Sequence, residues 1–383
     1  MSVEIQTAWA YLARVAEPPC SALLALVESV GPQEAAERIR RGEVGPELAR
    51  LTEARRELDC AAEDLELLHR RGGRLITPGD QEWPLLSLAA FNGAPVRDKS
   101  QGRAPLALWV IGGHRLDQVA ERSVAIVGTR ASTAYGEHVA AELAAGLVER
   151  DVTVVSGGAY GIDGAAHRAV LAGEGVTVAV LAGGVDVLYP AGHSAMLHRV
   201  AQQGLLVSEY PPGVRPARHR FLTRNRLVAA LSSATAVVEA GLRSGAASTA
   251  AWARALGRVV CAVPGPITSM ASAGCHQLIR SGAELVTRTD EIVELIGRAG
   301  EFAEERPRPA NPLDGLSETE LKVFEALPAR GARTPDQIAV AAGLPATSIL
   351  GPLAILEIAG LVQRRDGRWR LPSARLGADQ FGI

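Results

Sequence analysis

Between residues 123 and 297, short apolar runs alternate with amphipathic segments, and this alternation constrains the fold more than any other feature of the chain. The runs are rich in Val, Ile and Leu without polar interruption, which predicts strands covered on both faces. The segments between them have apolar spacing near 3.6 residues, which predicts helices. Strand–helix alternation is typical of a parallel, doubly wound sheet. We therefore predict an α/β fold with an extended Rossmann-like, mostly parallel sheet.

Segments of different composition flank this region. The N-terminal part shows helical spacing broken by Gly and Pro, and a Pro-rich charged stretch follows the α/β pattern. Near the C-terminus, a helix, a helix–turn–helix with a turn at Gly343 and a hairpin form a winged-helix-like pattern. The predicted division is a helical domain over 1–72, an extended Rossmann-like domain over 73–299, a linker over 300–315, a winged-helix-like domain over 316–374 and a tail over 375–383.

Composition and local sequence patterns indicate where in the cell the chain is expected to act. The 383 residues are 47% hydrophobic with a formal net charge of -2, so a large core is available. We find neither an apolar run long enough to cross a bilayer nor a signal-peptide pattern at the start. The four cysteines form no CxxC pair and no zinc-ligand spacing, as expected for reduced thiols. We predict a cytoplasmic protein without membrane association and without a metal site.

Loops rich in Gly and Ser follow almost every predicted strand. Ligands of open parallel sheets bind beyond the carboxyl ends of the strands, where backbone N–H groups and helix N-termini can hold an anion. Several such loops on one edge favour a binding site over ordinary turns. The loop residues that we assign to this site are Gly128, Thr129, Arg130, Ser156, Gly157, Gly158, Tyr160, Gly161, Ser244 and Gly245.

The same loops lack the motifs of common cofactor-binding sites and of common catalytic sites. Ala159 breaks the G-x-G-x-x-G spacing, and Ser156 stands where a ribose-binding acid would end the second strand. A GK[ST] sequence is absent, so a Walker A loop is excluded. We therefore predict no cofactor. His167 and nearby acids form no recognised catalytic motif, so no catalytic residue is assigned. Asp163 is interpreted as a helix cap or first-turn acid, whereas Glu239 is left open between a structural and a functional group.

An arginine cluster at residues 215–226 contains one aromatic ring and lies within a stretch, between Tyr210 and Val238, that has no Asp or Glu. We expect an irregular surface segment followed by a helix from Phe221. The residues of this cluster that we assign to the same binding site are Arg218, Arg220, Phe221, Arg224, Asn225 and Arg226.

In that predicted helix, Leu222, Val228 and Leu231 are expected to point inward, and Arg224 and Arg226 to lie in the first turn. Cations are unfavourable beside the positive helix end, which suggests a bound anion. Arginines for phosphates and an aromatic ring for stacking are the elements of a groove for single-stranded nucleic acid.

A series of motifs resembles the DNA-processing protein A family (DprA, also called Smf). The motifs are VAIVGTRASTAYG, VVSGGAYGIDGAAHRAVL, TVAVLAGGVDVLYPAGH, LVSEYPPG, FLTRNRLVAALS, VVEAGLRSGAASTAAWA, AVPGP and GCHQLIRSGAELV. The resemblance implies a non-enzymatic homodimer that binds single-stranded DNA and loads the recombinase RecA during natural transformation. It also implies DNA contacts for Arg130 and for the FLTRNR residues. Many members have Arg where this chain has Tyr160, which leaves open whether that ring stacks on a base or packs.

Two of the glycine-rich loops also suggest an alternative function as an enzyme. The GGAYG and SGAAST loops loosely resemble the Rossmann-like nucleoside-monophosphate phosphoribohydrolases of the LOG type. Those enzymes usually carry P-G-G-x-G-T-x-x-E, whereas this chain has no Glu at the corresponding place after Thr249. The missing acid argues against hydrolysis.

The C-terminal helix–turn–helix leaves several functions open. It could bind duplex DNA, a protein partner or nothing. The expected recognition helix, PATSILGPLAILEIAG, has no Arg or Lys. Base reading by this helix is therefore not expected, and docking of a partner is favoured.

Overall fold

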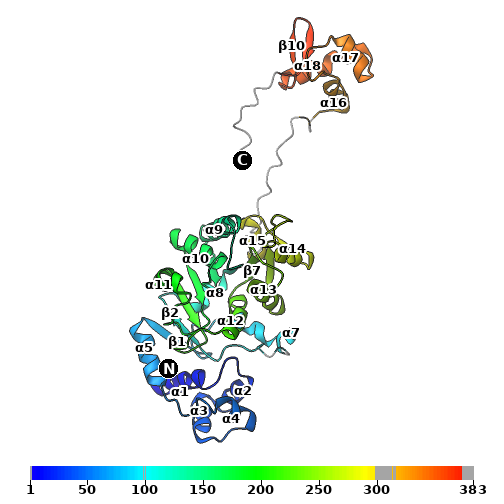
Figure 1. The fold of residues 1–383 in the computed structure, drawn as a ribbon. Coiled ribbons are helices and arrows are strands. Elements are labelled where there is room, and N and C mark those ends of the chain that lie inside the picture. Colours follow the sequence, from blue (N-terminus) through cyan, green and yellow to red (C-terminus); the bar gives the residue numbers. More distant parts are fainter. Residues whose placement is uncertain (1, 98, 100, 298–312, 314–315, 373–383) are drawn as a thin grey trace. The chain divides into compact units, whose positions relative to one another are not determined.

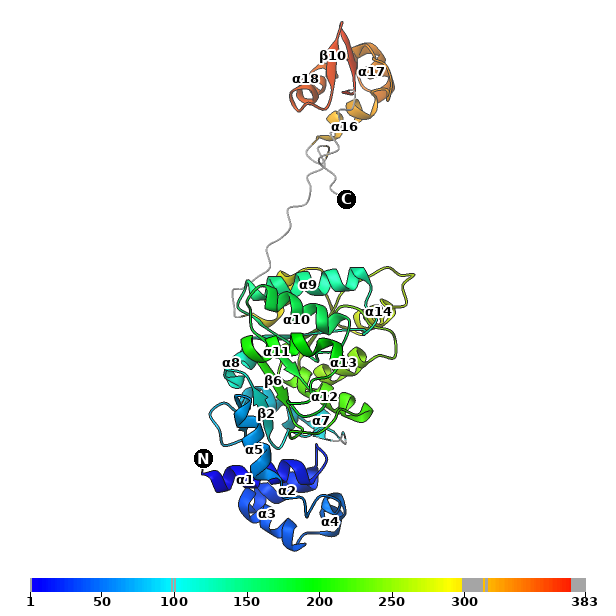
Figure 2. The same ribbon diagram turned by 60° about the vertical axis from the view of Figure 1, so that its left-hand side comes forward.

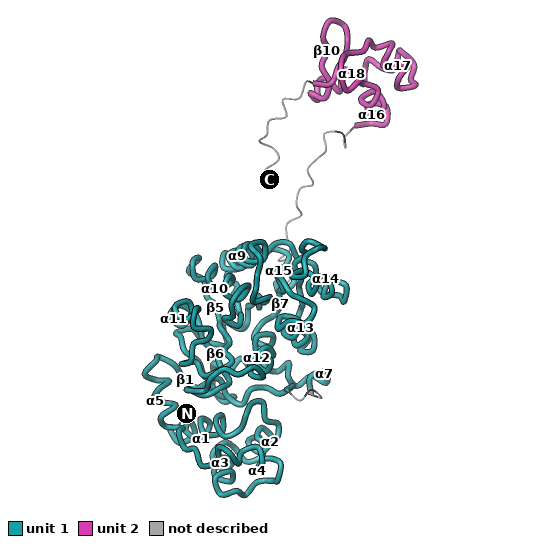
Figure 3. The backbone as a smooth tube through the Cα atoms, viewed as in Figure 1, with its two compact units in different colours: residues 1–303 teal, residues 304–383 magenta. Residues whose placement is uncertain are grey.

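The computed structural model describes residues 2–97, 99, 101–297, 313 and 316–372 (Figure 1). The chain divides into two compact units, residues 1–303 and 304–383 (Figure 3), and each is described by itself. The predicted linker over 300–315 lies outside the described residues except at Leu313, and so does the predicted tail over 375–383. The domain boundaries drawn from the sequence stay predictions.

The larger unit is built on a nine-stranded sheet of order β1-β2-β6-β5-β4-β3-β7-β8-β9. Neighbouring strands from β6 to β9 are parallel, whereas β2 is antiparallel to β1 and to β6. The strands are β1 Gly73–Ile76, β2 Leu108–Ile111, β3 Ser123–Val127, β4 Thr153–Ser156, β5 Thr177–Val180, β6 Leu205–Ser208, β7 Ala234–Val237, β8 Val259–Ala262 and β9 Glu284–Leu285. The mostly parallel sheet was predicted, but β1 was not, because only its last two residues, Leu75 and Ile76, have apolar side chains and they follow Gly73 and Arg74.

Helices cover both faces of the sheet, as the uninterrupted apolar strands predict. On one face the core joins the sheet to α8 (Leu116–Glu121), α12 (Arg218–Ala230) and α13 (Gly245–Ala255). On the other face lie α9 (Ala134–Val148), α10 (Ile162–Ala172) and α15 (Thr289–Ile296), with α9 and α10 side by side (Figure 2). The remaining elements here are α6 Leu85–Leu88, η1 Ala89–Asn92, α7 Ala94–Arg97, η2 Ala191–His193, α11 Ser194–Gln203 and α14 Ala273–Arg280.

The N-terminal helices pack on the sheet. Tyr11 and Leu12 are buried in the same core as Leu75, Trp109 and Leu206 of strands β1, β2 and β6. The helices are α1 Val3–Val15, α2 Ser21–Val30, α3 Pro32–Arg41, α4 Pro46–Thr52 and α5 Ala61–Arg70. Residues 53–60 connect α4 to α5. This layer and the sheet share one hydrophobic core.

The smaller unit has its own core, in which Val323, Ile338, Leu353 and Trp369 are buried together. Its elements are α16 Glu318–Glu325, α17 Pro335–Ala342, η3 Ala346–Ser348, α18 Leu350–Ile358, β10 Gln363–Arg365 and β11 Arg368–Arg370. Gly343 ends α17 with φ of 66°, the left-handed conformation that glycine adopts without strain. The predicted succession of a helix, a helix–turn–helix and a hairpin is confirmed.

Within the described residues, we find no single helix with the length and apolar character needed to span a membrane. Only α17 and the segment Ala346–Ile358 would meet that requirement as a pair, and they are bent by 104°.

Candidate nucleic-acid interface

A groove of about 890 Å³ lies at the carboxyl ends of the central strands. Strand β3 is flanked by β4 on one side and β7 on the other, so the order of the chain reverses there. The backbone N–H of Thr129, after β3, donates to the carbonyl of Glu239, after β7, at 2.7 Å. The groove thus occupies the switch point at which open α/β sheets bind ligands.

Ten of the residues assigned from the sequence line this groove. They are Gly128, Thr129, Arg130, Gly157, Arg218, Phe221, Arg224, Asn225, Ser244 and Gly245. The strand-end loops and the arginine-rich segment therefore meet, although about ninety residues separate Arg130 from Arg224. Six assigned residues are not among the lining residues: Ser156, Gly158, Tyr160, Gly161, Arg220 and Arg226.

Positive charge dominates the lining. Four arginines line the groove, against the single carboxylate of Asp163, which is buried. The arginines are Arg130, Arg218, Arg224 and Arg243. Arg243 was missed by the sequence analysis, although it directly precedes Ser244 in a loop already chosen. Since the side chains of Arg130, Arg218 and Arg243 are exposed, the groove offers three solvent-accessible cations to an anionic ligand.

Two aromatic rings lie beside these cations. The rings of Tyr189 and Phe221 have centroids 5.6 Å apart and are tilted by 53°. The guanidinium of Arg130 lies 5.0 Å above the Phe221 ring, within cation–π range. Tyr189 is 48% exposed and Phe221 is partly buried. The groove therefore combines aromatic surface with a cation that can reach a phosphate next to it.

The first turn of α13 forms another part of the wall. Ser244 caps this helix by accepting a hydrogen bond from the backbone N–H of Ala247 at 3.2 Å. Asn225 donates through Nδ2 to the carbonyl of Gly245 at 3.2 Å and ties α12 to this turn. Because Gly245 and Ala246 line the groove, the positive end of α13 adds to its attraction for anions.

Arg224 lies at the floor, and its side chain is 5% exposed. Its Nη1 donates to the carbonyl of Gly157 at 2.7 Å and also to that of Val180. Burial lowers the pKa of Arg224, while the nearby Asp163 carboxylate raises it. A Cβ on residue 157 would lie 2.3 Å from Arg224 Nη1, so only glycine permits this approach. Arg224 thus joins α12 to the ends of β4 and β5 and presents little of itself to solvent.

The observed start of α12 corrects one expectation. The helix begins at Arg218, not at Phe221, so Arg218 and Arg220 occupy the first turn and Arg224 and Arg226 follow later. The argument that cations beside the positive helix end suggest a bound anion therefore applies to Arg218 and Arg220, not to Arg224 and Arg226. Leu222, expected to point inward, is 50% exposed, whereas Val228 and Leu231 are buried as expected.

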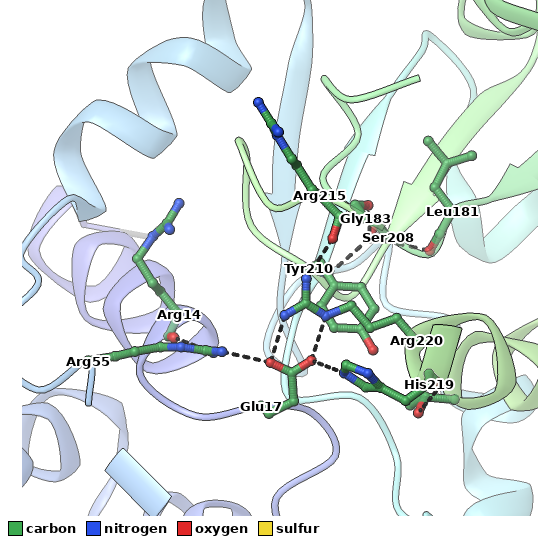
Figure 4. A network of polar contacts seen from close by, with 11 residues as sticks. Arg14, Glu17, Arg55, Leu181, Gly183, Ser208, Tyr210, Arg215, His219 and Arg220 are labelled. Carbon is green, nitrogen blue, oxygen red and sulfur yellow. Dashed lines mark hydrogen bonds and ion pairs between the residues drawn. The ribbon is translucent and has the colours of Figure 1, made fainter. Parts of the chain in front are cut away.

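The arginine cluster is compensated by acids from elsewhere in the chain. Glu17 accepts hydrogen bonds from Arg220 Nε at 2.6 Å and from Arg55 Nη2 at 2.8 Å, and His219 Nε2 lies 3.3 Å away (Figure 4). Burial would raise the pKa of Glu17, but hydrogen bonds from Arg220 and Arg55 outweigh it and lower the pKa to about 2. Because Glu17 lies 203 residues before Arg220 in the sequence, the sequence analysis did not identify it as the partner of this arginine.

Arg226 is also paired, and it is fully buried. Its Nη2 donates to both carboxylate oxygens of Glu209, at 2.7 and 2.6 Å, and the two side chains are 0% and 3% exposed. Burial raises the pKa of Glu209, and the positive charge of Arg226 opposes that rise. Arg220 and Arg226 hold α12 in place and are not groove-lining residues.

Beyond Gly157, Ala159 and Asp163 still line the groove, whereas the assigned residues Ser156, Gly158, Tyr160 and Gly161 do not. Ser156 is buried and donates through Oγ to the carbonyl of Ile126 at 2.6 Å. Tyr160 is half-exposed and packs edge-on against the ring of His193, with centroids 4.7 Å apart. Gly161, with φ of 75°, precedes α10 as its N-cap, and a Cβ there would meet the Thr129 carbonyl at 2.2 Å. Gly158, with φ of 69°, is buried before it.

The two acids weighed from the sequence have structural partners. Asp163 lies in the first turn of α10, as expected, and accepts hydrogen bonds from the backbone N–H groups of Gly157 at 3.1 Å and Ala159 at 3.4 Å. Glu239 is 2% exposed and accepts from Thr133 Oγ1 at 2.6 Å and from its backbone N–H at 3.0 Å. Of the two readings left open for Glu239, these contacts favour the structural one.

Models of two protein families match the chain. The family described as DNA recombination-mediator protein A matches residues 74–297, and a DprA winged helix domain matches residues 306–368. The first match spans the groove and every residue assigned to it. The second confirms the winged-helix-like fold expected near the C-terminus.

Individual relatives agree with these matches. The chain is 70% identical to a DprA of Mycobacterium tuberculosis over 373 residues, which cover 97% of this chain and 95% of that protein. It is 39% identical to the Smf protein of Escherichia coli over 266 residues, 69% of this chain and 71% of the relative. The X-ray structure of DprA from Streptococcus pneumoniae superposes with a TM-score of 0.62 at 29% identity, over 76% of this chain and 97% of that one.

Proposed function

This chain belongs to the DNA recombination-mediator protein A family, a family of DNA-processing proteins, and on that premise we propose that its groove binds single-stranded DNA. The observation that carries the proposal is the meeting of exposed arginines with the Tyr189–Phe221 ring pair in one groove. Unpaired strands expose both phosphates and base faces, whereas a duplex hides the base faces.

We assign separate roles to the groove residues. Arg130, Arg218 and Arg243 contact phosphates, because they are exposed cations on the lining. Phe221 and Tyr189 stack on bases. Arg224, Arg220 and Arg226 act as positioning residues, because their guanidinium groups are already engaged by protein oxygens.

A salt titration with oligo-dT tests the proposal. If about four phosphates are neutralised, log K should fall with log[salt] at a slope near -3, that is about -0.7 per phosphate. Arg130→Gln should reduce the steepness by about 0.7 and weaken binding at low salt. Arg280→Gln, at an exposed arginine of α14 that does not line the groove, is the matched control for net charge. Equal effects of the two variants, or no binding of oligo-dT at low salt, would contradict the proposal.

A binding role is favoured over the hydrolase alternative. The phosphoribohydrolase motif needs an acid facing the ribose, and Glu239 is instead held by Thr133 and is not among the groove-lining residues. Incubation with AMP should release no adenine. Adenine release that is abolished by Glu239→Gln would instead support an enzyme.

The family resemblance supplies the finer parts of the proposal. We propose that the chain acts in the cytoplasm as a homodimer and loads RecA on the bound strand, in cells that take up DNA. In an assay of RecA filament assembly on strands covered by a single-strand-binding protein, the chain should shorten the lag. Arg130→Gln should lengthen it again in proportion to its loss of DNA affinity.

A further inference from the structure

Arginine is concentrated on the β10–β11 hairpin of the smaller unit, the end labelled β10 in Figure 1. Four arginines fall within seven residues, namely Arg364, Arg365, Arg368 and Arg370. Among the described residues of the hairpin, the only ion pair joins Arg365 to Asp366 at 3.9 Å, with side chains 73% and 93% exposed. Solvent screens such a pair, so it neutralises little of the charge.

The strand register places three of these cations on one face. Gln363 is opposite Arg370, Arg364 is opposite Trp369, and Arg365 is opposite Arg368. Because side chains alternate along a strand, Arg365, Arg368 and Arg370 share the face opposite to that of Trp369, whose ring is buried in the unit's core. Like charges directly opposite each other destabilise a strand pair. A bound polyanion would remove this repulsion between Arg365 and Arg368.

A tight two-residue turn joins the strands that carry these side chains. Asp366 and Gly367 have φ of 53° and 74°, the positive values of a two-residue type I′ turn. Beside the strands, an open concavity of about 360 Å³ is lined by Arg364, Arg365 and Arg370, with Glu357 as its only acid. The surface thus offers an ordered set of cations and space next to them.

The other residues of the smaller unit indicate which form of DNA the hairpin can bind. Helix α18 has no Arg or Lys and exposes Ile355 and Ile358, so it offers no donor to base edges. Trp369, the only aromatic ring of the hairpin, is 5% exposed and is not available for base stacking. A single strand would therefore find cations without a stacking platform. The backbone of a duplex needs only the cations, because it presents about one negative charge per 1.7 Å of helix axis.

We propose that the β10–β11 hairpin binds the phosphate backbone of double-stranded DNA without sequence preference, as a second nucleic-acid site on the chain. The groove of the larger unit and the hairpin differ in the property that decides their ligands. The groove pairs arginines with accessible rings, whereas the hairpin has arginines alone.

The test uses the full chain and a blunt-ended duplex of mixed sequence, with binding followed by fluorescence anisotropy over a range of salt concentrations. The triple variant Arg365→Gln, Arg368→Gln, Arg370→Gln removes the three cations of the shared face. It should bind the duplex about tenfold or more weakly at low salt, and its salt slope should lose about 0.9 per phosphate contact. Its binding of oligo-dT should change less than twofold. The corresponding triple Arg→Lys variant should keep the slope, because it keeps the charge.

A second triple variant, Arg38→Gln, Arg41→Gln, Arg70→Gln, removes the same net charge from one half-buried and two exposed positions of the N-terminal helices. It should leave duplex binding unchanged. Three outcomes would overturn the proposal: the hairpin variant keeps full duplex affinity, the two Gln variants lose it equally, or the hairpin variant loses oligo-dT binding as strongly as duplex binding. Failure of oligo-dT binding by the unaltered chain would count against the groove and not against the hairpin.

Discussion

At the scale of single residues, Phe221 is the clearest probe of stacking. Its ring is close to both the Tyr189 ring and the Arg130 guanidinium. Phe221→Ala should weaken oligo-dT binding by about 1–3 kcal/mol with little change in salt slope, because it removes a stacking surface and no charge. Phe221→Tyr should retain most of the affinity.

Leu222→Ala is the neighbouring control for Phe221, since Leu222 also lines the groove and is 50% exposed. It should have a much smaller effect on binding, measured by anisotropy. If Phe221→Ala instead lowers the free energy of unfolding and leaves affinity intact, the ring packs in the fold and does not stack on a base.

Arg226 and Glu209 form a buried ion pair. Removing only one of its two charges should destabilise the fold more than removing both. Arg226→Met leaves the Glu209 carboxylate buried without its cation and should lower the free energy of unfolding by about 3–5 kcal/mol. The double variant Arg226→Met, Glu209→Gln should lose much less, because no charge is left buried. Urea unfolding of the three proteins measures this coupling.

The pH dependence of the single variant follows from the raised pKa of Glu209. Without Arg226 that pKa rises further above its unfolded value, so the folded state is relatively favoured at low pH and loses stability as pH rises. The deficit of Arg226→Met should therefore be larger at pH 8 than at pH 5. An equal deficit at both values would show that Glu209 is not the source of the cost.

At the scale of elements, α12 is fixed to the sheet by its own arginines. Arg220 binds Glu17 of the N-terminal layer, Arg224 reaches the ends of β4 and β5, and Arg226 reaches Glu209 after β6. These bonds set the position from which Arg218 and Phe221 face the groove. The helix is therefore both part of the wall and the link to the N-terminal helices.

Glu17→Gln tests that link through pH. Because the pKa of Glu17 in the folded chain is about 2, below its ordinary value of 4.5, the carboxylate stabilises the fold above pH 4.5. This contribution is lost as pH falls from 4.5 towards 2. Since the side chain is 34% exposed, we expect about 1–2 kcal/mol after screening. Urea unfolding at pH 6 and pH 3 should show a smaller acid-induced loss for Glu17→Gln than for the unaltered chain.

Glu28→Gln, at an exposed acid of α2, is the control and should follow the unaltered chain at both pH values. Glu17→Gln should also weaken oligo-dT binding modestly at neutral pH, because the start of α12 loses an anchor. Unchanged binding together with unchanged acid stability would show that Arg220 does not need Glu17 to hold its position.

At the scale of the whole molecule, the shared core predicts which fragments fold. Residues 1–303 form one compact unit in which Tyr11 and Leu12 pack with Trp109 of the sheet. A fragment over 1–303 should give a cooperative thermal transition and bind oligo-dT with the salt slope of the full chain. A fragment over 75–303 would expose that core and should melt at a lower temperature. Equal melting temperatures would make the N-terminal helices an independent domain.

The residue patterns alone determined the fold class and the general place of the site. Apolar runs with interposed helical periods are a local property, and they suffice to specify a covered parallel sheet. Glycine at the strand ends is equally local, so Gly128, Gly157 and Gly245 could be assigned to one edge before the structure was known. The FLTRNR segment could be assigned because it joins cations and a ring within a few residues.

Only the tertiary structure decided which arginines face the groove. Glu17, the partner of Arg220, lies 203 residues away in the sequence. Glu209, the partner of Arg226, lies just outside the stretch without acids. The sequence therefore showed the arginine cluster as uncompensated. Packing places Arg226 inside and Arg130 outside, although both are arginines beside apolar residues. Periodicity gives the face of a helix but not the contacts made by the neighbouring layer. For this reason the binding edge followed from the sequence, and the division between binding and positioning residues required the fold.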